Sequence, residues 1–336
     1  MKYAFVVLIS LFAVAIPAGS LAAQNLQGLG NNAPNLNVYV SPAHPGPRQQ
    51  VAVTLESFAT DLDRASISWS LNDTAAKQGV GQKSFTFTTG APGTASRVAV
   101  NIITTAGEVW QKTITIYPAS VDLVWEAQSY TPPFYRGKAL YPYQGTVRIV
   151  AMPDIVAAGG TEFDPNNLVY NWQIDGNPAQ SASGYGKNVF VFQGGIPLKS
   201  NTISVNVSSL DQKYSAEGQT TITPVAPVVF LYDEDPLLGT LFNKALPGII
   251  TLQNQEVDLT AIPYFSGNLK RDSLTYAWQM NNQDVAGGQS TLAFRQQNGA
   301  AGNASVAVQI SNPSSIFQTA SGSITLSFGN GAASSF

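Results

Sequence analysis

The chain has 336 residues, of which 44% are hydrophobic and only 11% are charged, well below the roughly 25% of ordinary soluble domains. Its net charge of −3 and its lack of any basic run exclude a nucleic-acid-binding surface, because phosphate recognition needs clustered Lys and Arg. The chain contains no cysteine, so it forms no disulfide and carries no lipoprotein anchor, and a single histidine leaves no ligand set for a usual zinc site.

The first predicted element is a secretory signal peptide at residues 1–22. Lys2 supplies a positive start, residues 5–16 form an apolar stretch, and Ser-Leu-Ala at 20–22 fits a cleavage site. An uncleaved anchor is the alternative, but the stretch is shorter than the roughly 20 residues that span a bilayer. We therefore expect an exported chain, secreted or held at the cell surface, with the periplasm as a further location and no transmembrane segment after cleavage. Residues 23–34 lack periodicity and are predicted to form a flexible leader.

Alternating apolar and polar residues predict β-strands in the next segment, residues 35–118. The strand-like runs lie at 36–40, 51–55, 67–71, 85–87, 98–102 and 110–116, with Gly, Pro and Asn in the turns between them. No amphipathic helical stretch longer than about two turns occurs. Short strands separated by such turns indicate a β-sandwich.

One pattern then recurs along the chain. Trp69, Trp172 and Trp278 each lie in a strand-like run, and they are 103 and 106 residues apart. A solenoid repeat spans roughly 20–50 residues and a β-sandwich about 100, so each copy is a domain. The sequence thus predicts an all-β chain of three tandem β-sandwich domains, at 35–118, 119–224 and 225–328, followed by a tail at 329–336. The three tryptophans are predicted to be structural core residues.

The second and third copies share a Tyr-x-Trp motif, Tyr170-x-Trp172 and Tyr276-x-Trp278. Together with the strand order, this motif resembles the corresponding strand of PKD-like and related bacterial Ig-like domains, over residues 35–328. The resemblance implies that the Trp packs between two sheets. It also implies an exported bacterial protein, in which such modules act as spacers, adhesion units or accessory binding domains.

No catalytic residue is predicted. The only histidine, His44, lies in a Pro-rich turn and is expected to be an exposed loop residue, so a Ser-His-Asp arrangement would depend on it alone. No nucleophile-elbow, phosphate-loop or dinucleotide-binding motif occurs. The sequence therefore favours a protein that is not an enzyme. A hydrolase of unrecognised type would need paired carboxylates in a pocket.

An aromatic insertion at residues 125–143 is the candidate for a binding surface. It holds Trp125, Tyr130, Phe134, Tyr135 and Tyr141. Exposed rings bind sugars and proteins because they offer rigid, amphipathic area at low entropic cost. The favoured alternative is packing over the sandwich edge or the neighbouring domain, because the matching insertion of the third copy is rich in Leu.

An acidic cluster, Asp233, Glu234 and Asp235, is the candidate for a metal site. Carboxylate oxygens are the ligands that Ca²⁺ prefers, although the cluster lacks the spacing of an EF-hand loop. The alternative is a solvated loop that keeps a strand end soluble. No other cofactor is predicted.

The predicted function is that of a non-enzymatic exported bacterial protein with tandem Ig-like domains. It would act in cell-surface structure or adhesion, through contacts with surface proteins or glycans. A carbohydrate-binding accessory protein that uses the insertion at 125–143 is the alternative, and self-association is left open. The sequence does not name the ligand.

Overall fold

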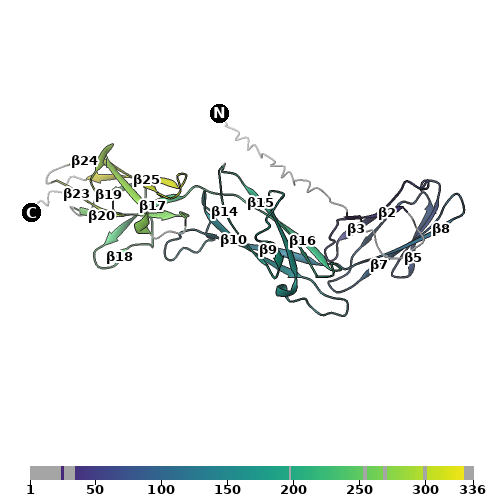
Figure 1. Ribbon diagram of the computed structural model, residues 1–336. Helices are drawn as coiled ribbons and strands as arrows, with labels where there is room; N and C mark the ends of the chain where they lie inside the picture. Colours follow the sequence, from purple (N-terminus) through teal and green to yellow (C-terminus); the bar gives the residue numbers. More distant parts are fainter. Residues whose placement is uncertain are drawn as a thin grey trace, which may run out of the picture. The chain divides into compact units, whose positions relative to one another are not determined.

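The computed structural model describes residues 35–196, 198–252, 256–267, 271–297 and 301–328, and the backbone of Gln24–Asn25. These residues form strands and two short 3₁₀ helices, with no α-helix in the described ranges (Figure 1). None of them forms a helix long and apolar enough to cross a membrane. The predicted signal peptide, residues 1–22, and the predicted tail, residues 329–336, lie outside the described residues.

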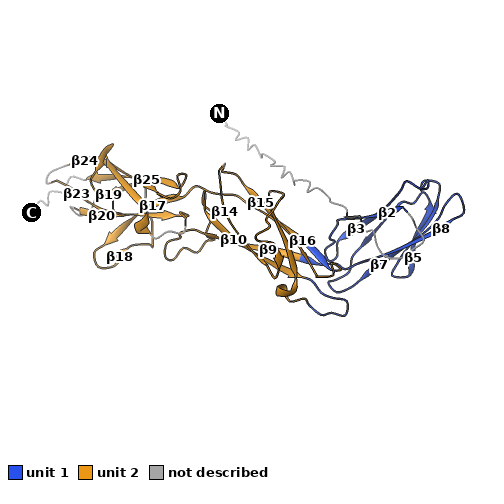
Figure 2. Ribbon diagram, in the orientation of Figure 1, with its two compact units in different colours: residues 1–120, 155–162, 214–216 blue, residues 121–154, 163–213, 217–336 orange. Residues whose placement is uncertain are grey.

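The chain divides into two compact units (Figure 2). The first comprises residues 1–120 with two segments from farther along the chain, 155–162 and 214–216. The second comprises residues 121–154, 163–213 and 217–336.

The first sandwich consists of two antiparallel sheets. One has the order β1-β2-β3-β6, from β1 (Gln24–Asn25), β2 (Leu36–Ser41), β3 (Gln50–Ser57) and β6 (Ser84–Thr88). The other has the order β5-β4-β7-β8, from β4 (Ser66–Leu71), β5 (Thr74–Val80), β7 (Ser96–Ile103) and β8 (Val109–Ile116). Strand β1 pairs with β2, so part of the segment expected to be a flexible leader is in a sheet.

The second sandwich repeats this arrangement. One sheet has the order β14-β10-β9, from β9 (Ser120–Gln128), β10 (Thr146–Asp154) and β14 (Val189–Gln193). The other has the order β12-β11-β15-β16, with β13 also paired to β11. Its strands are β11 (Val169–Ile174), β12 (Asn177–Pro178), β13 (Gly184–Tyr185), β15 (Asn201–Ser208) and β16 (Ser215–Ile222).

The third sandwich adds a parallel edge strand. One sheet has the order β18-β17-β20-β23, from β17 (Val228–Asp235), β18 (Gly239–Thr240), β20 (Glu256–Tyr264) and β23 (Thr291–Arg295). The other has the order β19-β25-β24-β21-β22, from β19 (Ile249–Thr251), β21 (Thr275–Met280), β22 (Gln283–Val285), β24 (Gly302–Ser311) and β25 (Thr319–Phe328). Strand β19 runs parallel to β25.

In each sandwich the first, second and fifth main strands form one sheet, and the third, fourth, sixth and seventh form the other. This division matches an Ig-like β-sandwich in which the strand after the third pairs with the third, as the added strands of the variable type do. The fold is therefore all-β, with tandem Ig-like sandwiches.

The three repeated tryptophans lie between the two sheets of their sandwiches, and each is at most 2% exposed. Their indole N–H groups donate to main-chain carbonyls of Gln82, Lys187 and Gln289, at 2.8–2.9 Å. Each ring packs against a Phe of the opposite sheet, namely Phe85, Phe190 and Phe294. A buried Trp with its N–H satisfied fills the core at no hydrogen-bonding cost.

The Tyr of the Tyr-x-Trp motif is also buried, and it closes the turn that precedes its strand. Tyr170 donates to the carbonyl of Pro165 at 2.8 Å, in the 3₁₀ helix η1 (Pro165–Asn167). Tyr276 donates in the same way to the carbonyl of Arg271, which begins η2 (Arg271–Ser273). Ile67 takes this position in the first sandwich, where it is buried and has no hydroxyl to donate.

The hairpin after each tryptophan strand has a two-residue turn with positive φ at both central residues: Asn72-Asp73, Asp175-Gly176 and Asn281-Asn282. Asn, Asp and Gly adopt this conformation more readily than other residues, and two such residues define a type I′ turn. The side-chain oxygen of the first residue accepts a main-chain N–H from Arg97, Thr202 or Ser305. Each turn is thereby hydrogen-bonded to the strand on the other side of the tryptophan strand, which is β7, β15 or β24.

Candidate functional site

The aromatic insertion leaves the second sandwich after β9 and pairs with the third. The main-chain N–H of Tyr130 donates to the carbonyl of Ser266, and the N–H of Phe265 donates to the carbonyl of Tyr130, both at 2.8 Å. Both residues that pair with Tyr130 follow directly on β20. The insertion is therefore hydrogen-bonded to the segment of the third sandwich that follows β20.

The rings of the insertion pack on rings of the third sandwich. Tyr135 lies edge-on to Tyr264 and Phe265, with ring centroids 5.8 and 5.7 Å away. Phe134 lies 6.5 Å from Phe242. Edge-on aromatic pairs at such distances are favourable beyond the area they bury.

Strands β17 and β20 supply the rings beneath the insertion. Val229 and Leu231 of β17 point into the core, so Phe230 and Tyr232 point out of the sheet. The Phe230 ring lies 5.2 Å from that of Tyr264, and the hydroxyls of Tyr232 and Tyr264 are 2.6 Å apart. Burial, with the hydrogen bond to Tyr232, raises the pKa of the Tyr264 hydroxyl.

These residues form one connected group, called here the aromatic surface: Phe134, Tyr135, Phe230, Tyr232, Phe242, Tyr264 and Phe265. Tyr232 and Phe265 are buried, but Phe134 is 86% exposed and Phe230 is 48% exposed. The inner rings thus pack between the two sandwiches, and the outer rings leave apolar area exposed to solvent.

Three residues of the expected binding set, Trp125, Tyr130 and Tyr141, do not belong to this surface, and Tyr130 pairs with the third sandwich through its main chain. Tyr141 is 2% exposed and lies edge-on to Phe192, so the expectation that it contacts a ligand is wrong. Trp125 is half-buried, and Lys138 Nζ lies 3.1 Å from its ring centroid. Burial lowers the pKa of Lys138. The cation–π contact occupies one face of the Trp125 ring.

Sequence reasoning missed the half of the aromatic surface that lies in the third sandwich. Phe230 and Tyr232 were assigned to no site, although β17 is apolar on both faces from Val228 to Tyr232. A strand that is apolar on both faces is typical of a sheet covered on both sides. That signal predicts a cover over β17, but it does not identify the covering segment.

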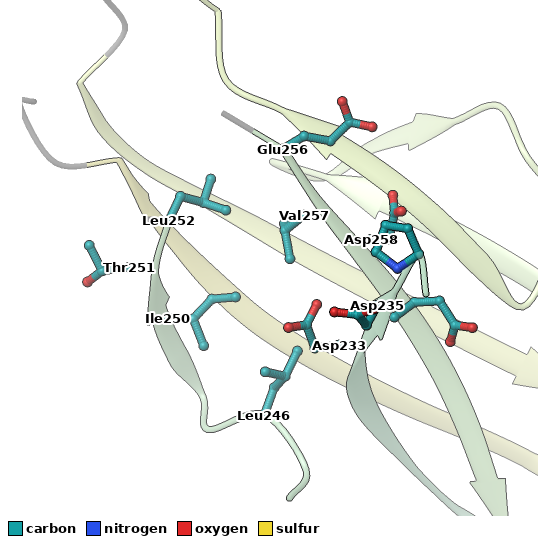
Figure 3. Close-up of a pocket in the computed structure, with 11 residues that line it drawn as sticks. Asp233, Asp235, Leu246, Ile250, Thr251, Leu252, Glu256, Val257 and Asp258 are labelled. Atoms are coloured by element: carbon teal, nitrogen blue, oxygen red, sulfur yellow. The ribbon is translucent and has the colours of Figure 1, made fainter. Parts of the chain in front are cut away.

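An open groove of about 550 Å³ lies at the end of the third sandwich where β17 ends and β20 begins (Figure 3). Apolar side chains of Leu246, Ile250 and Leu252 line one part of it. Asp233, Asp235 and Asp258 line another part. Burial and the neighbouring carboxylates of Asp235 and Asp258 raise the pKa of Asp233.

The three acidic residues predicted to bind Ca²⁺ make different contacts. Glu234 Oε2 accepts from the hydroxyls of Thr240 and Thr260, at 2.6 and 2.8 Å. Asp235 Oδ1 accepts the main-chain N–H groups of Leu237 and Leu238, which lowers its pKa. Among the residues that the structure describes, no group of three or more His, Cys, Asp or Glu is arranged to hold a metal ion.

His44 is half-buried rather than the exposed loop residue that was expected. Its Nδ1 lies 2.8 Å from the hydroxyl of Ser215, and both residues belong to the first unit. The contact joins two segments 171 residues apart in sequence.

No protein-family model matches the sequence, and no curated protein matches it. Among solved structures, the chain is similar to three N-terminal domains of the bacteriophage RB49 outer capsid protein Hoc, at 10% identity and a TM-score of 0.27, over 88% of this chain and 98% of that one. It is similar to the fibronectin-III array of RIM-binding protein, at 9% identity and a TM-score of 0.28, over 92% and 96%. It is similar to the Bacteroides ovatus protein SGBP-B of a mixed-linkage glucan utilization locus, at 12% identity and a TM-score of 0.22, over 92% and 70%. These values are too low to support an argument about ligand or activity.

Proposed function

We propose that the chain is a non-enzymatic, exported bacterial protein of PKD-like or related Ig-like domains that acts at the cell surface in adhesion or surface structure. The aromatic surface of the second unit carries the proposal. It presents Phe134, Phe230 and part of Tyr135 to solvent from two sandwiches at once. Exposed aromatic area of this kind is what protein interfaces use as their energetic centre.

The chemistry of the exposed rings favours a protein partner. The hydroxyls of Tyr232 and Tyr264 bond to each other, and the hydroxyl of Tyr135 donates to the carbonyl of Lys138. The outermost rings, Phe134 and Phe230, have no polar atom. An apolar side chain of a partner protein is therefore the better match than a sugar, which needs hydrogen bonds at its rim.

Binding of the labelled chain, residues 23–336, to intact cells of the producing organism tests this function. We expect saturable binding that falls about tenfold or more in Phe134→Ala and Phe230→Ala, as for truncation of an interface hot spot. Phe58→Ala is the matched control, because Phe58 is a Phe of the first unit that is also 86% exposed.

Pre-treatment of the cells identifies the class of partner. Loss of binding after protease treatment supports a surface protein. Binding that survives protease but is lost after glycan removal supports the alternative, a carbohydrate-binding accessory protein that uses Tyr135 and its neighbours. Binding that is unchanged in all of the Phe variants would overturn the role of the aromatic surface.

A further inference from the structure

Strand β19 of the third sandwich is an edge strand with one open side. Among the residues that the structure describes, it pairs with β25 alone. The carbonyl of Gly248 and the N–H of Leu252 bond to β25, at 2.8 and 3.0 Å. Because main-chain groups point to alternate sides along a strand, those of Ile249 and Thr251 are directed away from β25. The outer side of β19 is therefore able to pair with another extended chain.

The open groove at the end of the third sandwich lies beside this edge (Figure 3). Ile250 and Leu252 point across the groove towards Val257. All three are half-buried and pack against the core of the sandwich. A strand added to β19 would continue its alternation, so every second side chain of that strand would enter the groove. The edge and the groove can thus be filled by the same segment.

Asp233 places a carboxylate in this apolar groove. It lies on the core-facing side of β17, in line with Leu231, and across the groove from Ile250. Burial, and then the charges of Asp235 and Asp258, raise its pKa, as described above. A carboxylate that is partly buried beside like charges is stabilised by a cation that enters the site.

The rest of the groove lining is acidic as well as apolar. Among the described residues that line it, five are Asp or Glu and none is Lys, Arg or His. Glu256 is paired with Arg295, and Glu234 and Asp235 accept the hydrogen bonds given above. Asp233 remains available to a partner inside the groove. Complementary charge therefore favours a basic side chain as its occupant.

Other occupants satisfy only part of this arrangement. A metal ion lacks its ligands, since within the described ranges no group of three or more His, Cys, Asp or Glu is placed to hold one. An acidic segment would meet like charge, and a helix would leave the open edge of β19 unpaired. An extended segment with a basic and an aliphatic side chain two residues apart matches the edge, the apolar lining and Asp233 together.

We propose that the open edge of β19 binds an extended segment of a partner protein by strand addition. A basic side chain of that segment meets Asp233, and an aliphatic side chain two residues away packs against Ile250 and Val257. The contact shares no residue with the aromatic surface, so it adds a second binding site to the chain and does not rest on the first.

NMR titration of the chain, residues 23–336, with a short blocked peptide tests the proposal. The peptide has the sequence threonine-lysine-threonine-valine-threonine-lysine-threonine, which reads the same in both directions and so suits parallel and antiparallel pairing. We expect saturable shifts at the amides of Ile249 and Thr251. Replacement of both lysines of the peptide by glutamate should weaken binding about tenfold or more.

Two variants of the chain separate charge from strand pairing. Asp233→Asn should weaken binding about tenfold, whereas Asp284→Asn should not, because Asp284 is exposed in β22 at the opposite edge of the same sheet. Thr251→Pro should abolish binding, because it removes an N–H that points away from β25 and leaves the pairing with β25 in place. Circular dichroism establishes that each variant is folded. Should Thr251→Pro fail to fold, a peptide N-methylated throughout, which has no main-chain N–H to donate, supplies the same test.

The proposal is overturned if the lysine peptide leaves the β19 amides unshifted, or if Thr251→Pro or Asp233→Asn binds it as tightly as the unchanged chain. Sedimentation that shows a dimer lost in Thr251→Pro would instead assign the edge to a second copy. Phe134→Ala should leave peptide binding intact while it weakens binding to cells. Failure of this proposal is thereby distinguished from failure of the proposed function.

Discussion

Gln318 and Tyr143 join the second and third sandwiches by a hydrogen bond across 175 residues of sequence. The Gln318 Nε2 donates to the main-chain carbonyl of Tyr143 at 2.6 Å. Its Oε1 accepts from the N–H of Gly267 and from the Asn312 amide, each at 2.8 Å. Gln318 is buried, so one side chain satisfies three groups that water cannot reach.

Gln318→Ala should therefore loosen the contact between these sandwiches. The variant leaves the Gly267 N–H and the Tyr143 carbonyl without a partner, at a cost of about 1–3 kcal/mol for each buried group. Denaturant unfolding and hydrogen exchange at the Tyr130 amide measure the effect. Gln193→Ala, at an exposed Gln that donates to Gln144, should change stability by less than about 0.5 kcal/mol. Equal stability of the two variants would show that the contact between the second and third sandwiches does not depend on Gln318.

Truncation of a repeated tryptophan should unfold its own sandwich first. Trp172→Ala or Trp278→Ala should cost about 3–5 kcal/mol, because each removes a buried ring and leaves a cavity against Phe190 or Phe294. Calorimetry should show one transition moved to lower temperature while the remainder of the unfolding profile is retained. A profile without such a shift would contradict the core assignment.

The second sandwich should be sensitive to alkali through Tyr170. Burial, and secondly the charge of Asp164, raise the pKa of Tyr170 to about 12. The ordinary value is about 10, so the contribution of neutral Tyr170 to stability is complete below about pH 10 and is lost as the pH rises towards 12.

Denaturant unfolding at several pH values between 8 and 12 measures this loss. Tyr170→Phe should be less stable near pH 8, because the Pro165 carbonyl loses its donor, and should lose less stability on going to alkaline pH. Tyr185→Phe, at an exposed tyrosine of the same sandwich, is the control. Parallel profiles for the unchanged chain and Tyr170→Phe would rule out Tyr170 as the alkali-sensitive group.

Acid should weaken the turn that Asp175 anchors. The hydrogen bond from Lys199 lowers the pKa of Asp175, as do those from the Thr202 main chain and the Asn201 amide. A lowered folded-state pKa means that the stabilisation is present above the ordinary value of about 4 and is lost as the pH falls through the folded value. Asp175→Asn should therefore be less stable than the unchanged chain at pH 7, and this difference should shrink below pH 4. NMR titration with and without Lys199→Met checks whether Lys199 causes the lowered pKa.

Local sequence was enough to predict most of the main strands and their turns, but not β5 (Thr74–Val80), whose side chains are nearly all exposed and show no alternation. Alternation places Ile67 and Trp69 on the buried face of one strand regardless of which strands it pairs with, because side chains alternate in any sheet. Asn281 and Asn282 predict a tight turn because Asn tolerates positive φ. The Tyr-x-Trp spacing likewise predicts that Tyr276 and Trp278 face the core together.

The sequence alone could not place the candidate site. The aromatic residues of 125–143 are grouped in sequence because they are neighbours in the chain. In the structure, Tyr141 is buried against Phe192 of the second sandwich, whereas the Tyr135 ring packs on Tyr264 of the third. The Tyr135 ring meets that of Tyr264 across more than 100 residues of sequence, and Phe230 joins the group through Tyr264. Such contacts depend on how whole sandwiches pack, which no short-range pattern encodes.

The sequence by itself determined an all-β chain with a tryptophan core repeated at the length of a domain, because periodicity and turn chemistry act over a few residues. Only the tertiary structure decided which polar and aromatic residues share a surface. Asp233 and Ile250 line one groove although β17 and β19 belong to different sheets, and Phe134 meets Phe242 through the packing of one sandwich on the next. Both are set by the free energy of burying whole sheet faces, which is a property of the folded chain and not of any segment.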